Sequence, residues 1–322
     1  GHTYNQNHVK KDLTASTCMT FDELRQQNDA LYIALGAHTD KKTGIEGEDA
    51  EGVISAVEML REIGDDHMPD FRNKDIVVIG GGNVAMDVCR SAVRLGADET
   101  YVLYRRSEAE LPADPEEVKE AMEEGVQFRF LTAPVEILGE NGKVTGIRVE
   151  RMTLGEPDEK GRRKPVGTGE FETLAVSAVI SAIGQQIDLC GIDAGSKLQL
   201  GKRGTVLVDP ATYQTDEPDV FAGGDLVTGP KFAIDAIAAG KEAAISLHRY
   251  VHPGQTLTAG RDRRVYKALD KDHVLIETAG FDKDHRQTPG YNAAKAKTFS
   301  DARVTFTEEQ VRKECARCLG CG

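Results

Sequence analysis

The chain has 322 residues, of which 39% are hydrophobic and 29% are charged. These values are typical of a soluble globular protein of about two domains. The formal net charge of −13 argues against nucleic acid or an anionic membrane as a partner. No apolar run approaches the roughly 20 residues of a membrane span, and no signal-peptide pattern opens the chain. Gly1-His2 resembles a tag remnant, so we expect a fragment of a longer protein.

The first structured segment is predicted at residues 21–37, where a turn of helix leads into a strand. The apolar run at residues 31–35 ends at Gly36, and such runs are typical of fully buried strands. The same pattern returns at residues 178–186, where an apolar strand is followed by Gly184. The chain therefore contains two apolar strands that each end at a glycine corner.

The most informative stretch lies between these strands, at residues 76–106. A β-branched run at 76–79 predicts a parallel strand, which stops at three consecutive glycines. A helical pattern over 83–95 closes at Gly96 as a C′ glycine, and a second strand is predicted at 100–104. Strand, G-x-G-x-x-A turn, helix and strand form the βαβ unit that holds the pyrophosphate of a dinucleotide.

Each small residue of this turn has a physical task in phosphate binding. Gly80 permits the tight turn, Gly82 lets the backbone approach the phosphates, and Ala85 allows helix and strand to pack closely. The amides at the helix N-terminus then face the anion with the positive end of the helix dipole. The predicted pyrophosphate-binding residues are Gly80, Gly81, Gly82, Asn83, Val84 and Ala85.

The end of the second strand indicates which dinucleotide binds. Domains that prefer NAD usually carry an acidic residue there to hold the ribose 2′-hydroxyl. This chain has Arg105 and Arg106 instead, and a guanidinium suits a 2′-phosphate. NADPH is therefore favoured over NADH, although two arginines could also simply be solvated at a strand end.

The following segment is predicted to complete a nucleotide-binding domain. A helix is defined by an N-cap, a first-position proline, a capping-box glutamate and a stop glycine: Asp114, Pro115, Glu117 and Gly125. Strands are expected at 126–131, 135–138 and 144–152, with an Asn141-Gly142 hairpin turn between the last two. Residues 155–169, rich in glycine and basic residues, are expected to form an exposed hairpin loop.

The C-terminal half predicts short strands and two helices. Strands are expected at 205–209 and 220–222, the second ending at a Gly-Gly-Asp sequence. Apolar residues at helical spacing predict a helix over 232–250. Residues 251–310 are polar and are predicted to be an extended connector with one possible hairpin arm at 265–278. Thr307 is expected to cap a last helix.

Three of the six cysteines, Cys18, Cys89 and Cys190, are scattered along the sequence. They form neither a disulfide framework nor the closely spaced pair that a disulfide reductase needs, so that activity is disfavoured. A single buried cysteine usually acts as a small hydrophobic residue, and Cys89 is expected to be packed. A reducing, cytoplasmic location is favoured.

The other three cysteines, Cys315, Cys318 and Cys321, crowd the last eight residues. The C-x-x-C-x-x-C spacing opens an iron–sulfur ligand run, in which soft thiolates suit the cluster. Three ligands are one short of a complete set. A zinc knuckle or unliganded thiols are the alternatives.

Three phrases together resemble a known family: "GIEGEDAEGVISAVEML" at 44–60, "GGGNVAMD" at 80–87 and "LYRRSEAELPADPEEV" at 103–118. With the two glycine-ended strands, the chain resembles the two-dinucleotide-fold flavoproteins. Within them it is most similar to the small (β) subunit of NADPH-dependent glutamate synthase. Relatives of that subunit include ferredoxin:NADP transhydrogenase large subunits and the flavin–NADPH part of dihydropyrimidine dehydrogenase. The resemblance covers nearly the whole chain.

The resemblance implies an α/β fold in which a Rossmann-like NAD(P)H domain is inserted into the C-terminal remainder of a Rossmann-like FAD domain. Residues 1–72 would be the end of the first FAD segment and a connector. Residues 73–183 would bind NAD(P)H, and 184–250 would return to the FAD domain. Residues 251–322 would be a polar connector that ends in the cysteine motif.

The resemblance also implies an FAD site, with contacts from Gly36, Ala182, Gly184, Gly224 and Asp225. The Asp225 carboxylate would accept a hydrogen bond from a ribityl hydroxyl, although it could instead cap a helix. The family has a further G-x-G-x-x-G loop for the ADP half of FAD, and no such loop precedes residue 80 here. We therefore expect this fragment to bind FAD weakly or not at all.

The function implied is hydride transfer from NADPH to FAD, followed by electron transfer through a [4Fe–4S] cluster whose fourth ligand lies outside the chain. The acceptor would be a partner subunit or domain, glutamate synthase large subunit-like or ferredoxin-like. Direct hydride transfer needs no dedicated acid or base, so no catalytic side chain is assigned. The alternatives are a non-catalytic dinucleotide-binding scaffold and the same enzyme module using NADH.

Overall fold

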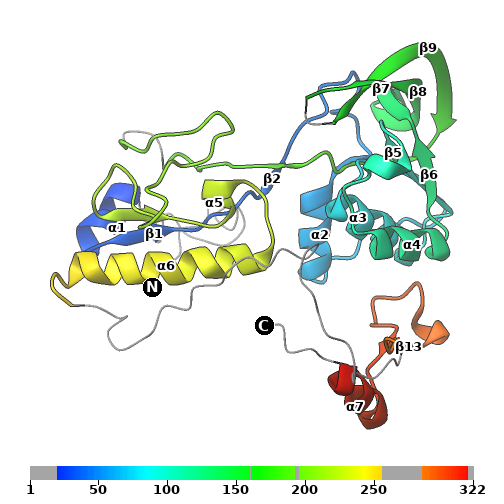
Figure 1. Cartoon of the computed structure of the whole chain (residues 1–322). Coiled ribbons are helices and arrows are strands. Elements are labelled where there is room, and N and C mark those ends of the chain that lie inside the picture. Colours follow the sequence, from blue (N-terminus) through cyan, green and yellow to red (C-terminus); the bar gives the residue numbers. More distant parts are fainter. Residues whose placement is uncertain (1–19, 160, 193–195, 256–284, 318–322) are drawn as a thin grey trace.

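The computed structural model describes residues 20–159, 161–192, 196–255 and 285–317. Figure 1 shows two folded units joined at β2 (Thr39–Asp40), with a short C-terminal segment below them. No helix among the described residues combines the length and hydropathy needed to cross a bilayer.

The larger unit is built on a five-stranded parallel sheet. Its order is β3 (Val53–Ser55), β10 (Ala178–Ser181), β4 (Asp75–Ile79), β5 (Glu99–Tyr104) and β6 (Gln127–Phe130). The strands predicted at 76–79, 100–104 and 126–131 are thus present within one or two residues. The pairing of β3 with β10 adds to this sheet a strand that lies before residue 73.

Both faces of the sheet are covered, by different layers. On β4, Ile76 and Val78 point to one side and pack with helices α2 (Ala56–Gly64), α3 (Asn83–Arg94) and α4 (Pro115–Glu124). Val77 and Ile79 point to the other side and pack against an antiparallel sheet. This two-sided burial explains why the strand is an unbroken apolar run in the sequence.

The antiparallel layer consists of β7 (Thr132–Glu140), β8 (Lys143–Pro157) and β9 (Arg163–Ala175). The predicted Asn141-Gly142 turn joins β7 and β8, and both residues have positive φ, as a two-residue hairpin requires. The prediction of a loop over 155–169 was wrong, because most of this stretch lies in β8 and β9. The pairing of β8 with β9 continues to Pro157 and Arg163. The two strands are joined by backbone hydrogen bonds, which form even where neither face of the strands is buried.

Helix α4 begins and ends where the sequence indicated. The Asp114 side chain accepts from the Glu116 amide, Pro115 is the first helical residue, and Gly125 ends the helix in the left-handed conformation. The predicted capping box with Glu117 was wrong, because the backbone N–H of Asp114 is donated to Asn83 instead. A short 3₁₀ turn, η2 (Glu108–Glu110), precedes this helix and follows β5.

The smaller unit packs β1 (Leu31–Ile33) parallel to β12 (Val220–Ala222). Its helices are α1 (Phe21–Gln27), α5 (Asp225–Thr228) and the long α6 (Ala233–Val251). The strand predicted at 205–209 was wrong: Val206 forms one isolated bridge, with Leu200. The Val206 N–H is donated to the Leu226 carbonyl, which directs this segment onto α5.

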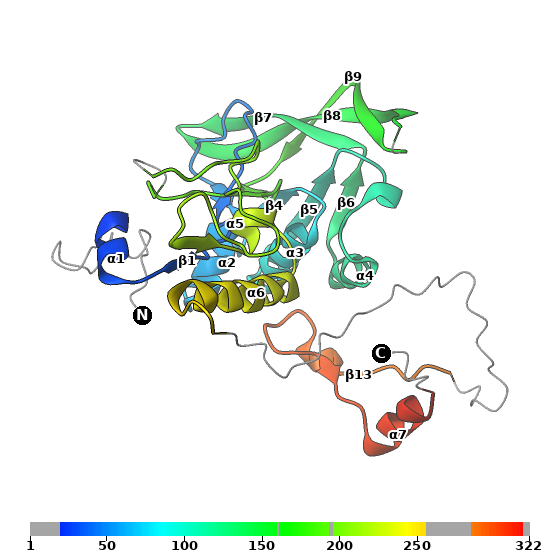
Figure 2. The same ribbon diagram turned by 60° about the vertical axis from the view of Figure 1, so that its left-hand side comes forward.

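The chain crosses between the units at β2 and β11 (Gln185–Gln186), which pair antiparallel. Thr39 faces Gln186 and Asp40 faces Gln185. Figure 2, turned by 60°, brings the smaller unit forward, and in this view α6 lies below the parallel sheet.

The C-terminal segment contains β13 (Gly290–Tyr291), the 3₁₀ turn η3 (Ala293–Lys295), β14 (Arg303–Val304) and α7 (Glu308–Arg317). The Thr307 hydroxyl accepts from the Gln310 amide at 3.3 Å, which confirms the predicted cap. The hairpin arm expected at 265–278 lies outside the described residues.

Candidate functional site

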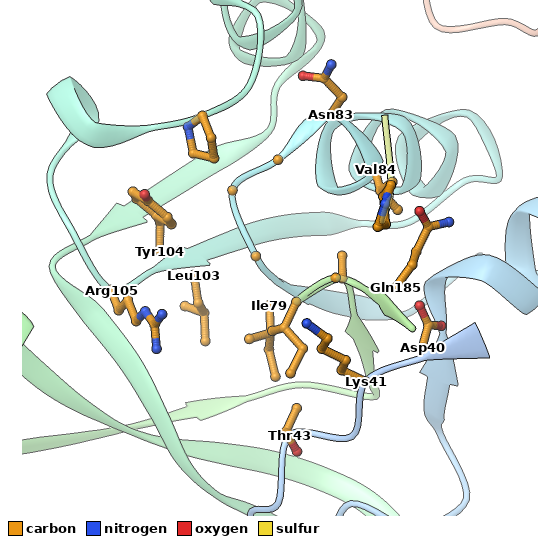
Figure 3. A pocket seen from close by; sticks show the side chains of 18 of the residues that line it. Asp40, Lys41, Thr43, Ile79, Asn83, Val84, Leu103, Tyr104, Arg105 and Gln185 are labelled. Carbon is orange, nitrogen blue, oxygen red and sulfur yellow. The ribbon is translucent and has the colours of Figure 1, made fainter. Parts of the chain in front are cut away.

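The carboxyl ends of β4, β5 and β10 open onto a cavity of about 1140 Å³. Figure 3 shows side chains around it from the start of α3, from β5 and from the two crossing segments, with Asp40 and Lys41 on one segment and Gln185 on the other. Ligands of open α/β sheets bind in such a crevice beyond the strand ends. Sequence-predicted residues in the lining are Gly80, Gly81, Gly82, Asn83, Val84, Arg105, Arg106, Ala182 and Gly184.

Two glycines of the loop are required by close packing. At Gly80, where φ is +147°, an added Cβ would lie 2.4 Å from the carbonyl oxygen of Ala182. At Gly81 an added Cβ would lie 2.5 Å from the ring of Tyr104. These two positions let the loop pass between β10 and β5.

The third glycine faces open space. A Cβ at Gly82 would meet nothing within 4 Å, so no neighbouring atom of the described chain requires a glycine there. Open space beside bare backbone, on the wall of a large cavity, suits close approach of a phosphate.

The same residue begins helix α3, and no side chain caps it. The amides of Ala85 and Met86 are donated to the Gly82 carbonyl. The amides just before them have no hydrogen-bond partner within the described part of the chain. Unpaired amides at the positive end of a helix dipole form an anion-binding site.

The wall next to the glycine loop is held by Tyr104 and Asn83. The Tyr104 hydroxyl donates to the Glu110 carbonyl at 2.6 Å, and burial raises the pKa of this hydroxyl. The Asn83 side-chain oxygen accepts from the Asp114 amide at 3.0 Å. The first bond connects β5 to η2, and the second connects the first residue of α3 to the N-cap of α4.

Four basic side chains reach the cavity, and two of them were not predicted from sequence. Arg105 and Arg106 follow β5, as expected. The buried Nε of Arg106 has no hydrogen-bond partner among the described residues. A buried donor without an acceptor destabilises a fold and is rare, so a bound ligand is a natural partner for it. Lys41 and Lys231 join them only through the tertiary fold, and no local sequence signal identified either.

The residues expected at the FAD site are divided, because Ala182 and Gly184 line the cavity and the other three do not. Gly36, Gly224 and Asp225 do not line this cavity. Gly224 has φ +67° and ψ −152°, a conformation that essentially only glycine adopts. The Asp225 Oδ1 accepts from the Lys231 amide at 3.1 Å, leaving its second oxygen for another donor. Ala85 is fully buried and packs α3 on the sheet.

The described cysteines do not form a redox pair. Cys89 is buried in the core, its thiol donates to the Met86 carbonyl at 3.3 Å, and burial raises its pKa to about 12. Cys190 is partly exposed, and Cys315 is exposed on α7. Cys18, Cys318 and Cys321 lie outside the described residues.

Comparison with known proteins agrees with this geometry. The family described as pyridine nucleotide-disulphide oxidoreductase matches residues 3–240. The NADP(+)-dependent formate dehydrogenase subunit beta of Moorella thermoacetica is 40% identical over 314 residues, which cover 94% of this chain and 44% of that protein. The glutamate synthase [NADPH] small chain of Escherichia coli is 36% identical over 239 residues, covering 69% and 50%.

Among solved structures, Mycobacterium tuberculosis FprA in complex with NADPH superimposes with a TM-score of 0.60 at 23% identity. The match covers 71% of this chain and 65% of FprA, and it confirms the two-dinucleotide α/β fold. The chain spans about half the length of the curated relatives it matches.

Proposed function

The chain belongs to the pyridine nucleotide-disulphide oxidoreductase family, and from this membership we propose that it binds NADPH in a flavin-dependent oxidoreductase. Its relatives include the glutamate synthase small chain, in agreement with the resemblance seen in the sequence. When bound, NADPH would supply a hydride for transfer to FAD. The protein positions the two groups and provides the electrostatic environment.

One observation carries the proposal. The bare backbone at Gly82 faces the cavity at the uncapped start of α3. A dinucleotide pyrophosphate fits this position because it needs amide donors, a positive field and no intervening side chain. Gly80, Gly81, Asn83, Val84 and Ala85 shape the loop around it.

The preference for NADPH rests on the arginines that follow β5. Arg105 and Arg106 line the same cavity as the glycine loop, and the unsatisfied Nε of Arg106 offers a donor. A ribose 2′-phosphate would satisfy this donor and accept from Arg105. Lys41 and Lys231 line the same cavity and add positive charge to it.

The flavin site is proposed for the smaller unit and its connections. Gly36, Ala182, Gly184 and Gly224 would border the ring and ribityl chain, and the second oxygen of Asp225 would accept from a ribityl hydroxyl. No G-x-G-x-x-G loop precedes residue 80 to hold the ADP half.

Onward electron transfer is proposed through the C-terminal cysteines. Cys315 is exposed in the last turn of α7, where a thiolate can reach a metal cluster. With Cys318 and Cys321 it would supply three ligands of a [4Fe–4S] cluster. The acceptor would be a partner subunit or domain, glutamate synthase large subunit-like or ferredoxin-like. We place the protein in the cytoplasm because its cysteines suit a reducing compartment.

Two measurements test this function. Calorimetric titration of the chain should show NADPH binding at least about tenfold tighter than NADH, as one charge-assisted contact implies. The full-length, flavin-loaded protein should reduce a dye with NADPH. Equal affinities would remove the 2′-phosphate assignment and leave an NADH enzyme. Tight binding without dye reduction would leave a non-catalytic scaffold.

A further inference from the structure

We propose that His38, Asp188 and Cys190 form a binding site for one Zn²⁺ ion where the two units are joined. One nitrogen of His38, one carboxylate oxygen of Asp188 and the sulfur of Cys190 lie within 4.8 Å of one another. None of the three residues lines the nucleotide cavity. The inference therefore stands independently of the proposed function.

The spacing of the three donors is close to that of a tetrahedral zinc site. The Cys190 Sγ and the His38 Nε2 are 3.9 Å apart. With metal–ligand bonds of about 2.0 to 2.3 Å, ligand atoms in a tetrahedron are roughly 3.3 to 3.8 Å apart. The 3.9 Å separation of sulfur and nitrogen is close to this range, and a bound ion would draw the donors together.

The local backbone brings Asp188 and Cys190 together. The Asp188 Oδ1 accepts from the Cys190 amide at 2.8 Å, and Cys190 has a left-handed φ of +54°. This conformation is uncommon for a residue with a side chain. Asp188 is exposed to solvent, so an incoming ion can reach its carboxylate.

The two ring nitrogens of His38 have different surroundings. A partly buried imidazole usually has hydrogen-bond partners at both nitrogens. The Nδ1 of His38 is buried without a partner among the described residues, and its Nε2 faces sulfur. Nε2 is therefore the nitrogen that an ion shared with the Cys190 sulfur would contact.

The three donor atoms favour Zn²⁺ over other common metal ions, and they can neutralise its charge. Sulfur and imidazole favour zinc-like ions, whereas Mg²⁺ and Ca²⁺ prefer all-oxygen sites. On binding, the Cys190 thiol loses its proton to solvent and an S–Zn bond forms. Thiolate and carboxylate then neutralise the two positive charges, and water can complete the tetrahedron.

The position of the site gives it a structural role. His38 comes just before β2, and Asp188 and Cys190 follow β11. These two strands pair where the chain passes between the units. A bound ion would join the two connections side by side, next to the hydrogen bonds of the β2–β11 pair.

Cobalt(II), a spectroscopic substitute for zinc, tests the site directly. The C-terminal cysteines could also bind the ion, so the full-length chain carries Cys315→Ser, Cys318→Ser and Cys321→Ser. Titration with Co²⁺ should give one equivalent with a thiolate-to-cobalt charge-transfer band, which Zn²⁺ abolishes. Cys190→Ser should remove the band, and His38→Ala or Asp188→Asn should weaken binding at least tenfold. His67→Ala, at an exposed histidine, should change nothing.

A second measurement needs no ligand-site variant. In the same serine background, saturating Zn²⁺ should protect Cys190 from maleimide, as read by mass spectrometry of the digested protein. Equal labelling of Cys190 with and without Zn²⁺ would overturn the proposal. So would a cobalt band that survives Cys190→Ser, or the absence of any band.

Discussion

The side-chain oxygen of Asn83 accepts a hydrogen bond from the backbone N–H of Asp114 at 3.0 Å. This bond joins the first residue of α3 to the N-cap of α4. It links the proposed phosphate-binding loop to the second helix of the same layer. Four predictions concern this loop, the cavity and the smaller unit.

Replacing Asn83 should separate stability from nucleotide binding. Asn83→Ala removes the acceptor and should lower the free energy of unfolding by about 0.5 to 1.5 kcal/mol. Asn83→Asp keeps an acceptor, so its stability should stay near that of the wild type. Its new negative charge should repel the pyrophosphate and weaken NADPH binding. Urea unfolding and calorimetry measure the two effects, and equal stability of Asn83→Ala and wild type would contradict the role of this bond.

The glycine loop offers a matched pair of substitutions. Gly80→Ala should destabilise the fold by at least about 2 kcal/mol, because its Cβ would lie 2.4 Å from the Ala182 oxygen. Gly82→Ala meets open space and should change stability by less than about 0.5 kcal/mol. The methyl group would nevertheless occupy the proposed phosphate position and should weaken NADPH binding at least tenfold. Unchanged NADPH affinity in a folded Gly82→Ala protein would place the pyrophosphate elsewhere.

Arg105 should decide between the two nicotinamide cofactors. Loss of a charge-assisted hydrogen bond costs about 1.5 to 3 kcal/mol, or roughly 10- to 150-fold in affinity. Arg105→Ala should lower NADPH affinity by this factor and leave NADH affinity nearly unchanged. Arg129→Ala is the control, because Arg129 packs over the Tyr101 ring and does not line the cavity. An unchanged ratio of the two affinities would remove Arg105 from the 2′-phosphate site.

The smaller unit should lose stability in acid through Asp219. Its carboxylate accepts two hydrogen bonds from Arg25, at 2.7 and 2.8 Å, and these hold its pKa below the ordinary value. Since the folded-state pKa is the lower one, the contribution is present above the unfolded-state value of about 3.9 and is lost as pH falls through the folded-state value.

Asp219→Asn should therefore destabilise the protein by about 1 to 2 kcal/mol at neutral pH. The free energies of unfolding of Asp219→Asn and wild type, measured as a function of pH, should converge as the pH is lowered. Asp70→Asn removes an exposed partner of Arg72 and should have no measurable effect. A difference in free energy of unfolding that stays the same at every pH would rule out the ion pair as the cause of the acid sensitivity.

Features that depend on local sequence were predicted well. The strand and helix around the glycine loop follow from an apolar run, three glycines and a helical pattern, all within 20 residues. Pro115 and Gly125 likewise fix the ends of α4 through backbone geometry alone. The Glu117 capping box failed because Asn83, 31 residues earlier, takes the N–H that the box requires.

Features that depend on long-range partners were missed. Nothing beside Lys41 or Lys231 in the sequence shows that they share a cavity with Arg105. The His38 and Cys190 side chains are 152 residues apart in sequence, so no spacing rule brings them together. Composition also misled at 155–169, where a backbone ladder forms without a buried face.

The crossing at β2 and β11 has a mechanical consequence. It contains only two residues on each strand, whereas each unit has its own apolar core. A rotation about this crossing would leave the cores intact and disturb few hydrogen bonds. Because Phe232 and Lys231 of one unit line the same cavity as Gly82 of the other, such a rotation would change the width of that cavity.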